Sequence, residues 1–333
     1  MLIGTVLLSI SFWIFDIGFI IEIAACLLFI GITLFLINIM LTVKDSKEKS
    51  IEIDFIQASV FWLWLTAFIG SLLAFNFKYI FLPKEHLYYL KIHAHIGLIG
   101  WFLCLIIGVG SKLIPMFLLS GKLNPKILTY SYYMINIGLL GFIVDALFYN
   151  GIDRIIIYLV IVLLAIIFFL IYIANAFKTR ARKKLDINLK YTYISFFLIF
   201  IPIILWIILR VNLISVNGIV QQISTAIVYS LLFGFITFLI LGQSLKNLAF
   251  IVWLKKYQEI SSKAKTPLPK NLYSEKIATA QLYIYIISFV TILSGILVSN
   301  PFSIKIGAIF LITTAVLYNI NIYKIISHKV LTQ

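Results

Sequence analysis

Two histidines, separated by one residue, open the segment of this chain that is best suited to chemistry. His93 and His95 begin an apolar stretch that passes Gly108 and Gly110 and ends at Pro115. Imidazole is a metal ligand and titrates near neutral pH, and an ionisable group within an apolar helix is a candidate functional site. This stretch is therefore the first place to look for a cofactor or metal site.

Helix geometry limits what these histidines can bind. Residues at i and i+2 point about 200° apart on a helix, so His93 and His95 cannot chelate one ion without local unwinding. His86 and His93 share a face but lie roughly 10 Å apart along the axis, too far for one metal. A second ligand must come from elsewhere, and the candidates are Met134, Met116, Lys91, water or a second subunit.

Two other roles are open for the ionisable residues at this level of the chain. His93 and His95 can be buried polar residues that only hydrogen-bond neighbouring helices. Arg210, at the end of a later apolar run, is either an anchor in the membrane interface or a partner for an anionic ligand. Asp145 and Lys91 are expected at the same depth as the histidines.

The composition identifies a polytopic membrane protein. Hydrophobic residues make up 62% of the chain, charged residues only 12%, and the mean hydropathy is +1.10. The apolar runs lack the period-two alternation of a barrel strand, so the predicted fold is all-α, a polytopic membrane helix bundle of about ten transmembrane helices. The runs are 2–15, 19–43, 55–76, 88–114, 127–148, 155–177, 191–211, 219–252, 277–298 and 302–326.

Lysine and arginine predict the orientation of these spans. With ten spans and both termini in the cytoplasm, 21 of the 27 basic residues fall in cytoplasmic segments, as the positive-inside rule requires. We call that side inner and the opposite side outer. His93 precedes Pro115 by 22 residues, or about 33 Å of helix, which places the histidines near the outer face.

One integral membrane domain, 1–333, accounts for the whole chain, with an N-terminal helix pair at 1–43 and a helix bundle at 55–333. The expected partners are the lipid bilayer and, for assembly, other membrane subunits or a second copy of the chain. A nucleic-acid partner is not expected, because the basic residues are spread over several short loops instead of one module.

The histidine helix resembles helix II of subunit I of the haem-copper oxidases. That family carries a haem-ligating histidine near the outer face, 22 residues before the proline of a glycine-rich G-x-G-N-x-L-[VI]-P ending. The matching residues are His93, Gly108, Gly110, Leu113, Ile114 and Pro115. The opening His93-Ala94-His95 followed by Gly100 also resembles NnrS, a haem- and copper-containing membrane family associated with nitric-oxide stress.

The resemblance implies an oxidase-like bundle in a bacterial cytoplasmic membrane, with a b-type haem on His93 and with His95 beside it or ligating something else. It is incomplete, because the chain has four histidines and none from Ile96 to Ser327. The copper site and the active-site haem ligand of the family are therefore not expected, nor is a complete terminal oxidase. Ser111 replaces the family's asparagine, and Lys112 follows it.

Two function classes follow. The first is a redox or gas-responsive membrane protein that binds at most one haem through His93. The second is a non-redox protein, either a structural subunit of a complex or a small-metabolite transporter. A transporter of this size is expected to contain two inverted halves with broken helices at corresponding positions. No counterpart of the His93 helix is predicted among residues 219–326.

Overall fold

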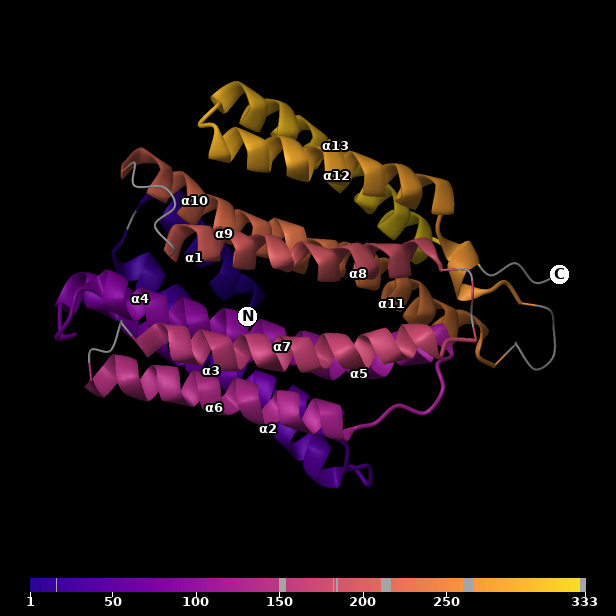
Figure 1. Cartoon of the computed structure of the whole chain (residues 1–333), viewed down its shortest axis with the longest axis horizontal. Coiled ribbons are helices and arrows are strands. Elements are labelled where there is room, and N and C mark those ends of the chain that lie inside the picture. The colour runs from indigo at the N-terminus through magenta and orange to yellow at the C-terminus, as the bar shows by residue number, and fades with distance from the viewer. Residues whose placement is uncertain are drawn as a thin grey trace. The chain divides into compact units, whose positions relative to one another are not determined.

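The computed structural model describes residues 1–15, 17–149, 154–181, 183, 185–210, 217–259 and 266–329. Every regular element within these ranges is a helix, and they form two compact units, Met1–Lys183 and Lys184–Gln333, which we describe separately. This confirms the all-α prediction (Figure 1). The prediction of one integral domain over 1–333 is not tested by it.

Among its described residues, the first unit contains seven α-helices and one π-helical segment. α3 packs against α2 on one side and against the helix of the histidines on another, while α6 pairs with α7 and α5 also contacts α7. The elements are α1 (Leu2–Ile14), α2 (Phe19–Asp45), α3 (Ile51–Tyr79), α4 (His86–His95), the π-helix η1 (Ile96–Leu103), α5 (Cys104–Leu118), α6 (Lys126–Phe148) and α7 (Ile155–Lys178).

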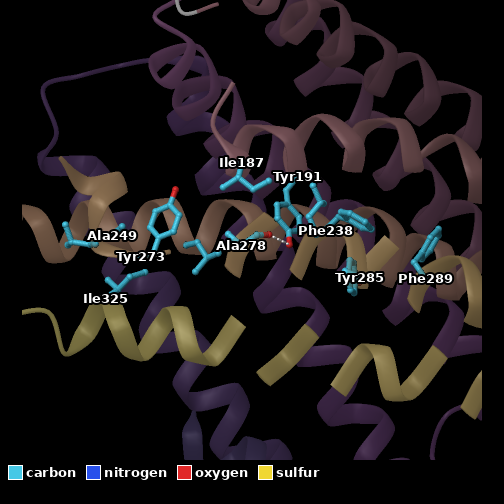
Figure 2. Close-up of a cluster of buried hydrophobic side chains, with 12 residues drawn as sticks. Ile187, Tyr191, Phe238, Ala249, Tyr273, Ala278, Tyr285, Phe289 and Ile325 are labelled. Carbon is cyan, nitrogen blue, oxygen red and sulfur yellow. Dashed lines mark hydrogen bonds between the residues drawn. The ribbon is translucent and has the colours of Figure 1, made fainter. Parts of the chain in front are cut away.

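The second unit has the pair α12 and α13 beside α8 and a long interrupted helix. Its elements are α8 (Ile187–Leu198), α9 (Phe200–Arg210), α10 (Asn217–Tyr229), the π-helix η3 (Ser230–Ile236), α11 (Thr237–Tyr257), the 3-10 turn η4 (Pro269–Leu272), α12 (Glu275–Leu297) and α13 (Pro301–Ile326). Figure 2 shows part of its core, where Tyr191, Phe238, Tyr285 and Phe289 pack together.

Nine helices of the described residues are long and apolar enough to cross a membrane, counting each interrupted helix once. The first helix, α1, has 13 residues and is about 20 Å long, which is less than the thickness of a hydrocarbon core. The predicted ten spans thus correspond to nine helices of spanning length and one shorter helix.

The two units repeat one plan of four successive helical segments. In the first unit they are α3, the continuous α4–η1–α5, α6 and α7, and in the second α8–α9, α10–η3–α11, α12 and α13. In both units the second segment contains a π-helix, which starts four residues before a glycine. That glycine is the first residue of the pattern G-x7-G-x3-K. The two stretches read GWFLCLIIGVGSK at 100–112 and GFITFLILGQSLK at 234–246.

The glycines of the two stretches make corresponding contacts. A Cβ on Gly108 would lie 2.8 Å from Phe55 Cβ, and one on Gly242 would lie 2.6 Å from Tyr191 Cβ. Phe55 and Tyr191 each lie four residues after the first residue of their helix. The π-helices and these glycines therefore hold equivalent helix pairs at the same close distance.

The prediction that the histidine helix has no counterpart among residues 219–326 is therefore wrong. Most residues between the shared glycines are apolar and differ between the copies, because lipid and a helix neighbour both accept Leu, Ile or Phe. Besides the glycines and the lysine, only Leu105 with Leu239 and Ile106 with Ile240 are identical at corresponding positions of the two stretches. Both copies run in the same order along the chain, so this is a tandem repeat of helices with no histidine in its second copy.

His328, just beyond α13, gives the second unit a pH-dependent contact. Its Nε2 lies 2.8 Å from the Tyr257 hydroxyl, and Lys256 donates to its backbone carbonyl. Partial burial, and then the charge of Lys256, lower the pKa of His328 below its ordinary value of 6.5.

A lowered pKa means that the folded state binds the proton less tightly than the unfolded state does. The contribution of His328 to stability is therefore complete above pH 6.5 and declines as the pH falls below that value. We expect a modest decrease in the unfolding temperature in detergent from about pH 7 to about pH 5, and a shallower one in His328→Gln. An identical pH profile for the two proteins would contradict this assignment.

Candidate functional site

His93 lies near the start of its membrane helix and points toward α3. Its side chain is half-buried, and Nδ1 is 3.0 Å from the backbone carbonyl oxygen of Thr66. A carbonyl oxygen only accepts, so Nδ1 carries the hydrogen in this contact and Nε2 keeps its lone pair. Metal-ligating histidines commonly have this arrangement, in which one ring nitrogen is held by a backbone carbonyl and the other is available to the metal.

Gly70 makes room for the imidazole, one helical turn after Thr66. A Cβ at Gly70 would come within 2.9 Å of Cε1 of His93. Any other residue would press on the ring, so the glycine allows His93 to lie directly on α3. Thr66 and Gly70 were missed from sequence, where a glycine four residues after a threonine in an apolar helix was the only signal.

His95 faces a different helix, as the two-residue spacing predicts. Its side chain is exposed, Nδ1 is 2.8 Å from the carbonyl oxygen of Lys91 on the same helix, and its ring centroid lies 5.0 Å from that of Phe142 on α6. In the second unit, Tyr229 stands at the equivalent place and stacks at 5.6 Å on Phe289 of α12. An aromatic ring against the third segment is thus common to both copies.

The seat of His93, by which we mean its contacts with Thr66 and Gly70 on α3, belongs to the first copy alone. The two copies are aligned by placing Gly100 opposite Gly234 and Phe55 opposite Tyr191. In this alignment, the positions equivalent to His93, Thr66 and Gly70 are held by Ile227, Pro202 and Trp206. The histidine and the glycine that accommodates it therefore differ together between two otherwise similar frameworks. Packing of the framework does not require an imidazole at this position.

The three side chains considered as a second haem ligand do not converge on Nε2 of His93. Lys91 is exposed on the same helix, and Met116 lies near the opposite end of that helix. Met134 is two residues from Asn136, whose side chain accepts a 2.9 Å hydrogen bond from Trp62. Trp62 packs against Gly100, so Met134 lies at about the depth of Gly100. Gly100 is seven residues from His93, or roughly 10 Å along the axis.

No group of three or more His, Cys, Asp and Glu side chains that could hold a metal ion occurs among the residues that the structure describes.

Charged groups gather near the outer end of the same unit. Asp145 is buried, and its Oδ1 lies 3.6 Å from Nη1 of the exposed Arg154. Lys84 and Tyr88 both donate to the carbonyl oxygen of Ala146. Sequence reasoning anticipated Asp145 at this depth but missed these cations, because a loop lysine or arginine looks like any interfacial residue until its neighbours are known.

Arg210, predicted as an interfacial anchor or as a partner for an anionic ligand, lies at the end of α9 in the second unit. It is exposed, and its guanidinium carbon is 5.4 Å from the ring centroid of Trp206. This contact agrees with an interfacial anchor. Its predicted role toward a ligand on His93 is not tested by the arrangement within either unit and stays a prediction.

A concave feature occupies the inner end of the first unit. It is an open groove of about 800 Å³ between the segment leading into α3 and the start of α6. Its polar lining includes Lys49, Glu52, Asp54, Tyr132 and Tyr133. Both charge signs are present, so the groove has no strong preference for an anion or a cation.

No protein-family model, no curated protein and no solved structure matches this chain. The resemblance of the histidine helix to the haem-copper oxidases and NnrS therefore stays a prediction based on that helix.

Proposed function

We propose that this protein is an integral membrane protein that binds one b-type haem through Nε2 of His93 and uses it in electron transfer or in the response to a diatomic gas, without a copper site. The observation that carries the proposal is the orientation of the imidazole, whose Nδ1 is held by the Thr66 carbonyl while its ring rests on Gly70. This leaves Nε2 as the coordinating nitrogen.

The replacement of His93 by Ile227 in the second copy further supports a role beyond packing. A haem ligated by one histidine keeps its other axial position for water, a gas or a ligand from another subunit. The Nδ1 of His95 is also held by a backbone carbonyl, but its ring lies against Phe142 of α6 and not on α3, so His95 serves beside the site or as a ligand to something else.

Optical spectra of haem-replete protein, oxidised and then reduced with dithionite, test the proposal. We expect a Soret band in the wild type and in His95→Ala, and none in His93→Ala. In reduced wild type, carbon monoxide is expected to shift the band, because a singly ligated haem can bind it. Added imidazole is expected to restore the band in His93→Gly, which separates loss of the ligand from unfolding.

The reverse pattern, with the band lost only in His95→Ala, would move the ligand to His95. The absence of any Soret band in haem-replete wild type would reject the proposal.

The second candidate is a non-redox membrane protein, either a small-metabolite transporter or a structural subunit. The polar groove at the inner end of the first unit favours it, because 800 Å³ is enough space for a small metabolite. Under this candidate, Glu52→Gln and Asp54→Asn alter ligand binding or transport while His93→Ala does not.

A further inference from the structure

A connected set of polar side chains lies inside the inner half of the second unit. Gln243 of α11 donates from Nε2 to Oγ1 of Thr192 at 2.6 Å, and Thr192 donates to the carbonyl oxygen of Asn188 at 3.1 Å. Asn188 donates from Nδ2 to the Tyr273 hydroxyl at 2.9 Å. These contacts join α8, α11 and the segment before α12 at a depth where the neighbouring core is apolar.

Two amide oxygens in this set have no hydrogen-bond partner. They are Oδ1 of Asn188, a residue that is 1% exposed, and Oε1 of Gln243. A buried carbonyl oxygen without a donor is unfavourable, and proteins normally satisfy such groups with ordered water. Both residues are bound to Thr192, Gln243 through Nε2 and Asn188 through its backbone carbonyl, so the two acceptors belong to one hydrogen-bonded set between α8 and α11.

The first unit shows that packing does not require these polar groups. The residues equivalent to Thr192 and Gln243 are Ile56 and Val109, beside the same close contact of a glycine with the first segment. An apolar pair therefore fills the same framework. The second copy carries a hydroxyl and an amide at the cost of burying them, which indicates a use for them.

The hydrogen-bonded set of polar side chains begins at the inner end of α8. Asp186, the residue before α8, lies 3.4 Å from Lys246, which follows Gln243 by three residues on α11. From Asp186 to Thr192 is six residues, or about 9 Å of helix. Tyr191, next to Thr192, and Phe238, five residues before Gln243 on α11, belong to the aromatic core, with ring centroids 5.9 Å apart. This polar track therefore runs from the Asp186–Lys246 ion pair to Thr192 and ends at the aromatic core.

We propose that water enters the second unit from the inner face along Asp186, Asn188 and Thr192, and that an ordered water donates to Oδ1 of Asn188 and Oε1 of Gln243. Water fits because both acceptors are neutral and a water has two hydrogens to donate. A metal cation fits poorly, because it needs about six oxygen ligands and the nearby carboxylate is paired with Lys246.

Cysteine accessibility in membrane vesicles tests the inlet. Cys26 and Cys104 are first replaced by alanine, and single cysteines are then introduced as Thr192→Cys and Tyr193→Cys. The two positions are adjacent in depth, but Thr192 is fully buried in the unit whereas Tyr193 is 46% exposed on its apolar surface. The probes are a charged methanethiosulfonate and the smaller silver ion, added from each side of the membrane.

We expect Thr192→Cys to react from the inner side at least about tenfold faster than Tyr193→Cys, because only a hydrated thiol ionises readily. Lys190→Cys, exposed near the same helix end, identifies which side is being probed and so separates an error in topology from a dry inlet. If Thr192→Cys does not fold, Gln243→Cys replaces it. Equal protection of these thiols and of Tyr193→Cys from both probes would overturn the proposal.

Discussion

Replacing Gly242 with leucine is expected to remove most of the folded protein, whereas replacing Gly110 with alanine is expected to leave it intact. A Cβ on Gly242 would lie 2.6 Å from Tyr191 Cβ and 2.9 Å from the backbone oxygen of Asn188, and neither atom is the flexible end of a side chain. Relief of that overlap requires α8 and α11 to separate. Overpacking of this kind costs about 1–3 kcal/mol or more, and leucine adds further atoms at the same point.

Gly110 provides the matched control in the equivalent helix of the first unit. A Cβ there would be 3.5 Å from Ile114 Cδ1 and 3.6 Å from Phe169 Cζ, which is ordinary contact. Alanine also favours the helix by up to about 1 kcal/mol over glycine. The measurements are the yield of monodisperse protein in detergent and its unfolding temperature. Wild-type values for Gly242→Leu would show that these helices do not approach so closely.

Gly70→Leu is expected to abolish the proposed haem binding nearly as completely as His93→Ala. The new side chain would occupy the place where Cε1 of His93 rests and would push the imidazole away from the Thr66 carbonyl. Loss of the group that orients a ligand typically weakens metal binding by about 10- to 100-fold. The ligand itself is still present in this variant, so the effect reports its orientation.

Phe68→Leu is the control for Gly70→Leu. Phe68 is exposed on α3 two residues earlier and packs on Phe29 of α2, at a centroid distance of 5.9 Å. The measurement is a haem titration followed at the Soret band, together with the unfolding temperature of each variant. Equal haem affinity in Gly70→Leu and wild type would mean that the seat on α3 does not orient the ligand.

Sequence alone determined the class of the protein and the local geometry of its histidines. Apolar runs of about 20 residues predict membrane helices because an unpaired backbone group is too costly in lipid. Helical periodicity likewise predicts that His93 and His95 diverge, as their contacts with α3 and α6 show. Both conclusions depend only on neighbours along the chain.

The seat of His93 and the polar track at Thr192 were decided by tertiary structure. Thr66 precedes His93 by 27 residues, and Gln243 follows Thr192 by 51, so no periodicity within one helix connects them. The repeat was hidden for a related reason, since its shared glycines are required by neighbouring helices: a Cβ on Gly108 would lie 3.2 Å from the backbone oxygen of Glu52, and one on Gly242 would lie 2.9 Å from that of Asn188. An apolar membrane helix can turn most of its faces toward lipid or protein at similar cost, so the choice of face depends on the close contacts that the folded chain makes.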